Sequence, residues 1–259
     1  MTKSLKKSLW KAFTALDARL KFPNLNPGKI GIQLGFDMAY PVTSDLFTMH
    51  KRVFPGGKVI GIDPDPNNHA VARKIIAHQG LNIDLIQLGT YSEQGKSTFL
   101  LGSKSSWNQL GIVPKDTTVE FRNESIEVKI DTLDHILNEL HIDKQQIGHI
   151  NMTINGAEYA TLLGAGSLLS EIDDLSLTVI AGRYDESGTI AGKPDYEMII
   201  PILKSHGFQV KFRRMHQLFW WGFVTRLLMN RRWIYGKQNF GVIMACKGKH
   251  RIKWYQSFS

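Results

Sequence analysis

Two short polar segments each follow an apolar run early in the sequence. QLGFDMAYP places Gly35 and Asp37 after KIGI, and GIDPDP places Asp63 after KVI. A glycine allows the tight turn and close backbone approach that a nucleotide-type ligand needs. An acidic side chain at the end of a second strand accepts hydrogen bonds from both hydroxyls of a ribose. Each residue alone is equally typical of a turn or loop, but the pair predicts a site for a nucleoside-containing cofactor.

The elements that must carry these residues alternate along the chain. From Lys29, short apolar runs are separated by helical stretches, which is typical of βαβ units and a parallel sheet. The predicted strands are 29–34, 58–62, 83–88, 148–154 and 175–181, and the predicted helices are 43–53, 67–79, 131–141, 158–170 and 194–206. Ligands of open α/β sheets bind outside the carboxyl ends of the strands. Both polar segments therefore meet at one edge of the predicted sheet.

Two segments depart from this alternation. Between 94 and 129 the helical period fails, and KSTFLLG, TVEFRN and SIEVKI predict a small β insertion with residues 103–108 at a mobile tip. FQVKFRR and NFGVIMACKG predict a final antiparallel pair that completes seven strands. The chain length suits one large domain with additions. We expect that domain at 27–259, after an N-terminal segment at 1–26.

Two flanking segments are basic and rich in apolar side chains. Within the N-terminal segment, residues 1–22 predict an amphipathic helix with lysines off its apolar stripe. Residues 215–235 combine aromatic residues such as Trp220 and Trp221 with several arginines. Both segments suit packing against the domain, and both also suit the surface of an anionic membrane. Stacking on bases or sugar rings would use the same aromatic residues.

Composition limits the classes of protein and of partner. The hydrophobic fraction is 42%, as in an ordinary globular domain, and the net charge of +9 favours a partner that carries negative charge. Cys246 is the only cysteine, which excludes an intrachain disulfide and a thiolate zinc cluster. We expect no metal, because the sequence shows no cluster of His and carboxylate ligands. No apolar run reaches the length of a membrane span and no signal peptide is visible, so we expect a cytoplasmic protein that binds a membrane peripherally, if at all.

Residues 29 to 182 resemble the FkbM-type S-adenosylmethionine-dependent methyltransferases. Gly35, Asp37 and Ala39 stand where that family has the Gly, Asn and Gly of its Gly-Ala-Asn-x-Gly turn, and VIGIDPDPNN resembles its acidic-Pro segment. VKIDTLDHIL and HINMTINGAEYATLLGA resemble its Thr-Leu-Asp helix start and its Lys-Ile-Asp-Val-Glu-Gly-Ala-Glu strand end. The resemblance implies a Rossmann-like class I α/β fold, with a mostly parallel seven-stranded sheet and helices on both faces.

The same resemblance implies a cofactor and a reaction. The methyl donor is S-adenosylmethionine, and the family methylates hydroxyls of sugars, polyketides and related natural products. The cofactor contacts carried over to this sequence are Gly35, Asp37 and Asp63, with Gly89 and Thr90 as a wall near the adenine.

The sequence departs from the family at several carboxylates. Gln33 replaces the acidic residue of the first strand, and Asn151, Thr153 and Asn155 replace Lys, Asp and the first Glu of the fourth-strand motif. Ala181 stands after the fifth strand, where an acidic residue is common. Methyl transfer to a hydroxyl benefits from a base, although alignment of donor and acceptor also lowers the barrier. The departures fit altered chemistry, and they also fit an enzyme that has lost its activity.

Candidate catalytic groups must therefore come from elsewhere. We single out Glu158 at the start of a helix, His135 near the expected substrate edge, and Asp185 after the fifth strand; His141 and His149 are weaker candidates. Each has a structural interpretation as well. Glu158 would meet the helix dipole as a cap, the histidines would be structural, and Asp185 would lie in a solvated loop.

These observations lead to two hypotheses of different class. The first is a methyltransferase that acts on oxygen of a hydroxyl-bearing small molecule, a glycan, or a lipid-linked or otherwise amphiphilic acceptor. The second is a catalytically silent methyltransferase-like subunit that serves as a scaffold in a protein complex at a membrane.

Two other classes are disfavoured. Nucleic-acid methylation is a weaker hypothesis. An Asn-Pro-Pro-Tyr-like motif is the usual mark of amino-group methylation on bases, and no such motif follows the fourth strand. A dinucleotide oxidoreductase would need Gly-x-Gly-x-x-Gly, and Asp37 would instead place a carboxylate against the pyrophosphate.

Overall fold

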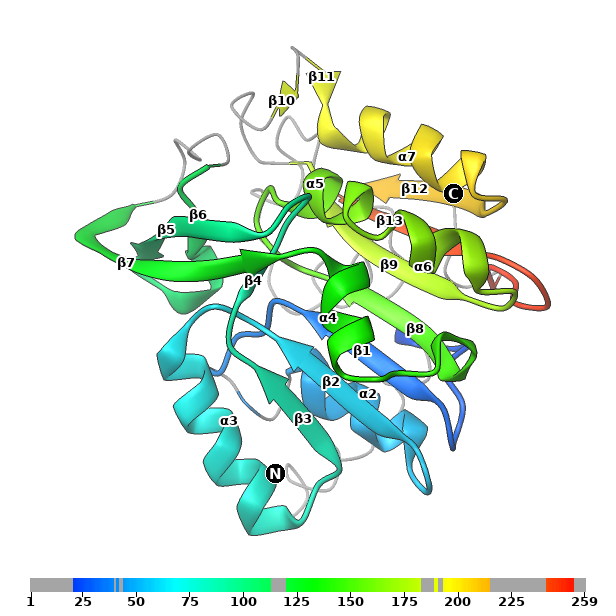
Figure 1. Cartoon of the computed structure of the whole chain (residues 1–259), viewed down its shortest axis with the longest axis horizontal. Coiled ribbons are helices and arrows are strands. Elements are labelled where there is room, and N and C mark those ends of the chain that lie inside the picture. Colours follow the sequence, from blue (N-terminus) through cyan, green and yellow to red (C-terminus); the bar gives the residue numbers. More distant parts are fainter. Residues whose placement is uncertain are drawn as a thin grey trace, which may run out of the picture.

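The core of the molecule is a seven-stranded sheet in the order β12-β13-β9-β8-β1-β2-β3 (Figure 1). The computed structural model describes residues 21–39, 41, 44–112, 120–182, 189–190, 193–214 and 241–253. The strands β1 (Ile30–Leu34), β2 (Lys58–Ile62), β3 (Ile83–Ile86), β8 (Ile147–Met152) and β9 (Ser176–Ala181) are parallel. β13 (Gly241–Cys246) is antiparallel to both β9 and β12 (Gln209–Arg214). The predicted seven-stranded sheet with its final antiparallel pair is confirmed.

Helices cover both faces of this sheet, as predicted. α2 (Asp45–Val53) and α3 (Pro66–Gln79) pack on one face in an apolar cluster with Phe22 and Leu25. α4 (Leu133–Glu139), α5 (Glu158–Leu163), α6 (Gly166–Glu171) and α7 (Asp195–Ser205) pack on the other face in a larger cluster. Burial of these apolar faces is what holds the layers together.

Two glycines bring α2 unusually close to the sheet. A Cβ atom on Gly31 of β1 would lie 2.7 Å from the side chain of Met49, and one on Gly61 of β2 would lie 2.7 Å from that of Leu46. A larger residue at either position would force the end of that α2 side chain to move. The close contact fixes the start of α2, with Asp45, beside the carboxyl end of β1.

The helix predicted at 158–170 is instead two helices, α5 and α6. Gly164 ends α5, and a Cβ atom there would lie 2.3 Å from the carbonyl oxygen of Tyr91. The carboxylate of Asp134 then accepts hydrogen bonds from the backbone N–H groups of Ser167 and Leu168, at 2.8 and 2.7 Å, in the first turn of α6. The continuous helix was a wrong prediction, because these contacts come from distant parts of the chain.

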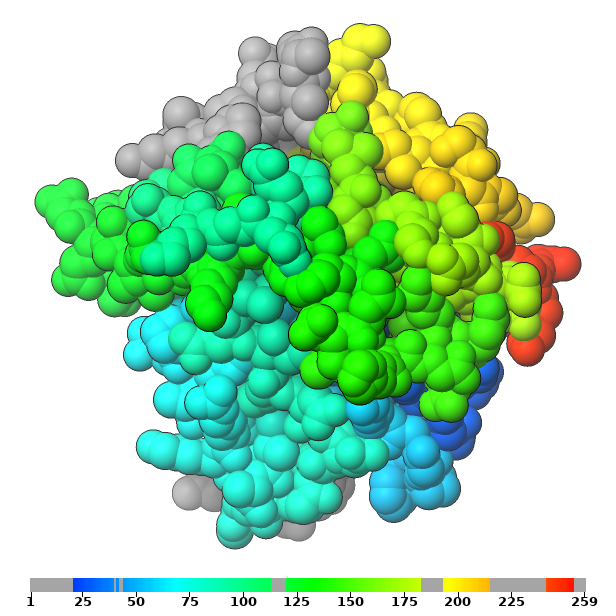
Figure 2. Space-filling view, viewed as in Figure 1, coloured from blue at the N-terminus to red at the C-terminus, as the bar shows by residue number. Residues whose placement is uncertain are grey.

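A second, four-stranded sheet lies beside the main sheet at its carboxyl edge (Figure 1). In the space-filling view, the green residues of this insertion project to one side of the molecule (Figure 2). It consists of β4 (Gly89–Thr90), β7 (Phe121–Asp131), β5 (Gly95–Gly102) and β6 (Gln109–Leu110), in that order. The turn 103–108, expected at a mobile tip, contains a 3-10 helix (Ser105–Trp107) and ends on buried Asn108. The end of this turn therefore packs inward at Asn108, whereas Ser103, Lys104 and Ser106 are exposed.

The remaining short elements are a 3-10 helix (Lys144–Gln146) before β8 and a hairpin of β10 (Thr189–Ile190) with β11 (Lys193–Pro194). Residues 1–20, Asp185 and the segment 215–235 lie outside the described residues. The N-terminal helix and the domain limits at 26 and 27 stay predictions. None of the helices in the described ranges is long and apolar enough to cross a membrane.

Candidate functional site

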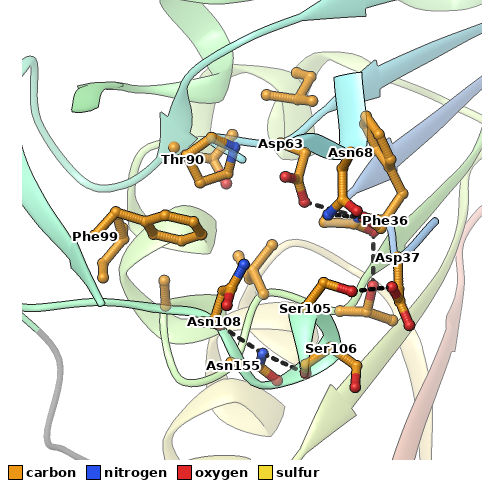
Figure 3. Close-up of a pocket in the computed structure, with 18 of the residues that line it drawn as sticks. Phe36, Asp37, Asp63, Asn68, Thr90, Phe99, Ser105, Ser106, Asn108 and Asn155 are labelled. Atoms are coloured by element: carbon orange, nitrogen blue, oxygen red, sulfur yellow. Dashed lines mark hydrogen bonds between the residues drawn. The ribbon is translucent and has the colours of Figure 1, made fainter. Parts of the chain in front are cut away.

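A pocket lies at the carboxyl ends of β1, β2 and β8, where the insertion sheet meets the main sheet (Figure 3). Its empty volume is about 750 Å³, which includes space open to solvent. We call it the cofactor pocket. All five predicted cofactor contacts line it, namely Gly35, Asp37, Asp63, Gly89 and Thr90.

Asp63 is the buried carboxylate of this pocket, and only 7% of its surface is exposed. Its Oδ2 accepts a hydrogen bond from the backbone N–H of Phe36 at 2.9 Å, and Oδ1 accepts one from Asp65 at 2.8 Å. Burial raises the pKa of Asp63 to about 7, against the lowering effect of these two bonds. Each carboxylate oxygen has further lone pairs, so Asp63 can still accept hydrogen bonds from ribose hydroxyls.

The turn after β1 is shaped by Gly35 and Asp37. Gly35 has φ of +72°, and a Cβ atom there would lie 2.3 Å from the carbonyl oxygen of Thr153, so the turn rests directly on the backbone that follows β8. The Oδ1 atom of Asp37 accepts hydrogen bonds from the N–H of Ala39, at 2.9 Å, and from the hydroxyl of Ser105. Asp37 thus ties the turn to the insertion at the pocket rim.

Apolar side chains form the far wall of the pocket. Leu88, Phe99 and Leu110 line it, and the latter two come from β5 and β6 of the insertion. A Cβ atom on Gly89 would lie 3.1 Å from Leu110, so the glycine keeps a narrow slot open. A flat apolar slot of this kind suits an adenine ring.

Two asparagines organise the pocket, and sequence reasoning missed both. Asn68 of α3 donates to the carbonyl oxygen of Phe36 at 2.7 Å and accepts from the N–H of Met38 at 3.1 Å. Asn108 donates to Oδ2 of Asp65 at 2.8 Å, which joins the insertion to the loop after β2. The only sequence signal was the polar run that continues GIDPDP into two asparagines.

The residues that replace family carboxylates after β8 make structural hydrogen bonds. Thr153 donates to the carbonyl oxygen of Gly35 at 2.8 Å. Asn155, at φ of +51°, donates to the carbonyl oxygens of Ser106 and Asn108 at 2.9 and 2.7 Å. These side chains hold the three loops around the pocket together without adding charge.

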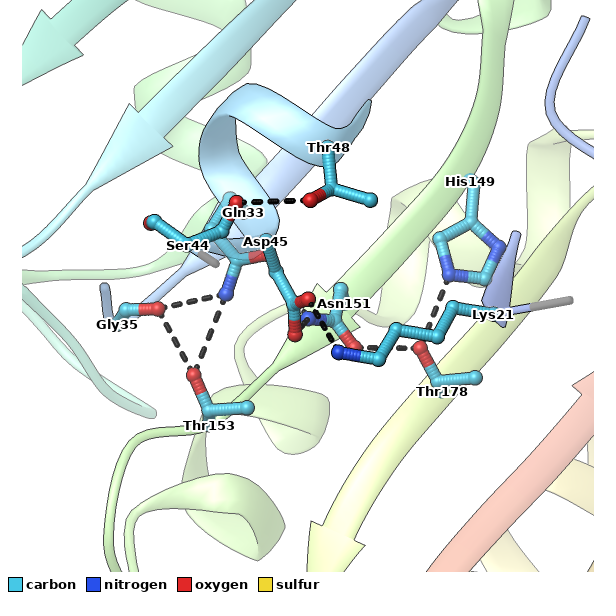
Figure 4. Close-up of polar contacts among 10 residues, drawn as sticks. All are labelled: Lys21, Gln33, Gly35, Ser44, Asp45, Thr48, His149, Asn151, Thr153 and Thr178. Carbon is cyan, nitrogen blue, oxygen red and sulfur yellow. Dashed lines mark hydrogen bonds and ion pairs between the residues drawn. The ribbon is translucent and has the colours of Figure 1, made fainter. Parts of the chain in front are cut away.

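Behind this turn, uncharged side chains form a network across β1, β8 and β9 (Figure 4). Gln33 donates to the carbonyl oxygen of Gly35 at 2.6 Å and accepts from Asn151 at 2.8 Å. Thr178 donates to Asn151, and His149 contacts the hydroxyls of Thr178 and Ser176. Burial lowers the pKa of His149 to about 3, so this histidine stays neutral.

The structure does not bring the predicted catalytic groups to the cofactor pocket. The carboxylate of Glu158 is buried and accepts from the N–H groups of Ile154 and Gly156 at 3.1 and 2.7 Å. Burial, reinforced by the charge of Asp195, raises the pKa of Glu158 to about 7. His135 is exposed and pairs with Asp131 at 2.8 Å. Asp185 lies outside the described residues, and within those residues no cluster of potential metal ligands occurs.

The strand order, the glycine turn after β1 and the carboxylate after β2 together define a Rossmann-like class I methyltransferase. The model of the FkbM methyltransferase domain matches residues 30–210, and the chain belongs to this family. Its methyl donor is S-adenosylmethionine. The pocket fits that cofactor, because it offers an apolar slot for adenine and, at Asp63, a buried carboxylate for the ribose.

Solved structures share the fold only distantly. A candidate rRNA methylase from Clostridium thermocellum is 13% identical, with 97% of this chain and 99% of that one covered and a TM-score of 0.49. Fibrillarin from Aeropyrum pernix, in complex with S-adenosylmethionine, is 11% identical over 91% and 74% of the two chains, with a TM-score of 0.45. No curated protein matches the sequence significantly. These likenesses are too weak to support a conclusion about the acceptor.

Proposed function

We propose that this methyltransferase methylates a hydroxyl oxygen of a saccharide, a lipid-linked or another amphiphilic acceptor. The observation that carries the proposal is the polar mouth of the cofactor pocket, where Asp37 is accompanied by uncharged hydroxyl and amide side chains. Ser106 and Asn155 are exposed there, and Ser105 and Thr153 are partly exposed beside them. Hydroxyl and amide groups match a polyol acceptor. The phosphates of a nucleic acid would call for cationic side chains instead.

The described residues of the pocket contribute to catalysis mainly by aligning the methyl donor with the acceptor, and less by acid–base chemistry. Asp37 and Asp63 are the titratable groups among its described lining residues. Asp63 faces the buried end, whereas Asp37 lies at the rim beside the acceptor mouth. A neutral hydroxyl loses its proton as the new C–O bond forms, and a carboxylate at the rim favours this step. Alignment of donor and acceptor by rigid loops accounts for most of the expected rate enhancement.

Transfer of a labelled methyl group tests this function. The purified protein is incubated with S-adenosylmethionine that carries an isotopically labelled methyl group, together with glycan and lipid extracts. We expect the label in a methyl ether, which resists mild alkali, and no label with Asp63→Ala. Label in an alkali-labile ester or on a nucleobase would refute hydroxyl methylation. Cofactor binding without transfer to any extract would favour the silent scaffold at a membrane complex.

An amphiphilic acceptor fits peripheral binding to a membrane, which we propose for residues 1–22 and 215–235. The support is their basic and aromatic composition. Vesicles that contain anionic lipid should bind the protein, and both added salt and the double change of Trp220 and Trp221 to Ala should weaken that binding. Indifference to both changes would count against a membrane role.

A further inference from the structure

The turn 103–108 of the insertion forms an outer wall of the cofactor pocket. Ser105, Ser106 and Asn108 line the pocket across from Asp63 (Figure 3). The first two residues of the turn and Ser106 are exposed to solvent. The turn therefore stands between this side of the pocket and the solvent, and its movement would open the pocket.

The strands that carry this turn are fixed by apolar packing. β5 ends at Gly102 and β6 begins at Gln109, so the turn itself belongs to neither strand. The two strands pair at Phe99 and Leu110, and both of these side chains are buried in the apolar cluster of the insertion. Movement of the turn alone would therefore leave the apolar wall of the pocket in place.

Side-chain hydrogen bonds attach the turn to the loops around the pocket. Ser105 donates to Oδ1 of Asp37, and the Nδ2 atom of Asn108 donates to Oδ2 of Asp65 at 2.8 Å. Asn155 makes a further attachment, through the backbone carbonyls of the turn. Asn108 and Asp65 are both buried, and a hydrogen bond to a carboxylate is stronger than one between neutral groups. Their bond is therefore a strong attachment of the turn to the ribose side of the pocket.

Asp65 has separate hydrogen bonds to the turn and to the loop that holds Asp63. Its backbone N–H donates to Oδ1 of Asp63 at 2.8 Å, and its own Oδ1 caps α3 by accepting from the N–H of Asn67 at 2.8 Å. Neither bond uses Oδ2, the atom that accepts from Asn108. The attachment of the turn can therefore break while Asp63 and the start of α3 keep their places.

We propose that the turn 103–108 is a lid, and that release of the hydrogen bond between Asn108 and Asp65 lets S-adenosylmethionine enter the cofactor pocket and S-adenosylhomocysteine leave it. Local opening of a few hydrogen bonds costs far less than unfolding of the domain, and lids of this kind control product release in many enzymes. The bond is intact before and after binding, so it controls the rates of exchange and not the affinity. The inference rests on the proposed function only in that the methyl donor occupies the cofactor pocket, and it holds for any acceptor.

The variant Asp65→Asn tests the lid without an acceptor. Asparagine caps a helix as well as aspartate does, but it has one acceptor oxygen where aspartate has two, so it cannot serve both Asn67 and Asn108. A chase of isotopically labelled S-adenosylmethionine with excess S-adenosylhomocysteine gives the dissociation rate, and titration calorimetry gives the dissociation constant. Both are measured well above the pKa of Asp63, which is about 7.

We expect about tenfold faster dissociation from Asp65→Asn, which equals ~1.4 kcal/mol of activation free energy. The dissociation constant should stay unchanged, so association is faster by the same factor. The unchanged affinity also shows that the variant is folded. Ser105→Ala, which removes the hydroxyl that donates to Asp37, should accelerate both rates in the same way.

The matched control is Glu127→Gln. It makes the same change from acid to amide within the insertion, at an exposed bond with Lys96 that does not line the pocket, so its rates should equal those of the wild type. Weaker binding to Asp65→Asn with an unchanged association rate would mean that Asp65 only supports Asp63, and it would overturn the lid. Unchanged rates in both Asp65→Asn and Ser105→Ala would overturn it as well, while leaving the proposed function intact. Failure of the wild type to bind S-adenosylmethionine would overturn the lid and the proposed function together.

Discussion

Asp63 and Glu158 are two buried carboxylates that follow parallel strands: Asp63 lies in the loop after β2, and Glu158 is the first residue of α5, after β8. Both accept hydrogen bonds from two backbone N–H groups, and burial raises the pKa of each to about 7. Asp63 lines the cofactor pocket, whereas Glu158 only supports the turn that starts α5. A buried carboxylate with a shifted pKa is therefore not by itself a sign of catalysis. Its place relative to the pocket decides its role.

The two loops also differ in what surrounds these carboxylates. The loop after β2 keeps the acidic residue that the family sequence predicts, whereas the loop after β8 has exchanged charged residues for Thr153 and Asn155. These two side chains have a structural role, because Thr153 donates a hydrogen bond to the carbonyl oxygen of Gly35 and Asn155 donates one to that of Ser106. The comparison teaches that the loop after β2 contributes a carboxylate to the cofactor pocket, whereas the segment after β8 contributes neutral groups that hold the surrounding loops together.

The largest effect should come from pH acting on Glu158. Its pKa is raised from 4.5 to about 7 in the folded protein, so its favourable contribution to stability is complete below pH 4.5 and is lost as the pH rises through about 7. Glu158→Gln removes this dependence. Relative to wild type, the unfolding free energy of the variant should improve by about 3 kcal/mol between pH 4.5 and about 8.

Urea unfolding across this pH range measures that change. Glu139→Gln, at a site whose side chain is 74% exposed, is the control and should show no such trend. Parallel pH profiles for wild type and Glu158→Gln would contradict the account of Glu158. The account also requires that Glu158→Gln bind S-adenosylhomocysteine normally, because Glu158 does not line the cofactor pocket.

A negative charge at position 33 of β1 should lower the stability of the protein, because Gln33 belongs to the uncharged network of β1 and β8. In Gln33→Glu, the amide that donates to the carbonyl oxygen of Gly35 becomes an oxygen, and the new charge lies near Asp45. We expect a loss of ~1–3 kcal/mol in unfolding free energy and no gain in methyl transfer. Gln94→Glu in the exposed turn before β5 should be neutral. If Gln33→Glu were as stable as the wild type and more active, the uncharged network would not be needed for the stability or the activity of the site.

The smallest of these effects concerns Asn155. Asn155→Ala removes two hydrogen bonds and leaves alanine at a positive φ, whereas Asn155→Gly removes the same bonds without the backbone strain. We expect a loss of ~2 kcal/mol for alanine and ~1 kcal/mol for glycine. Thermal unfolding separates the two. Identical wild-type stability for both variants would show that the turn 105–107 does not depend on Asn155.

The sequence alone predicted the sheet well, and the reason is local. Each parallel strand is a short apolar run between amphipathic helices, so its period is visible without tertiary information. Neither the break between α5 and α6 nor the burial of Asn108 at the end of the turn 103–108 was visible. They depend on contacts of Gly164 with Tyr91 and of Asn108 with Asp65, which come together only in the folded chain.

The candidate site divides in the same way. The pocket residues that directly follow strands, such as Asp63 and Gly89, could be identified from position and chemistry. Asn68, Phe99 and Asn108 could not, because they lie on a helix or on the insertion and reach the site through packing. Sequence reasoning also expected a catalytic carboxylate at Glu158, after β8, where the structure shows that this side chain accepts hydrogen bonds from the turn before α5.

The central claim is that Asp63 anchors the cofactor in a pocket that is formed and functional. Thermal unfolding of wild type and Asp63→Ala, with and without S-adenosylmethionine and S-adenosylhomocysteine, tests it most directly. At about a hundred times the dissociation constant, a ligand should stabilise the wild type by ~2.7 kcal/mol, and the same concentration should leave Asp63→Ala unshifted. No shift in the wild type, or an equal shift in both proteins, would contradict the account.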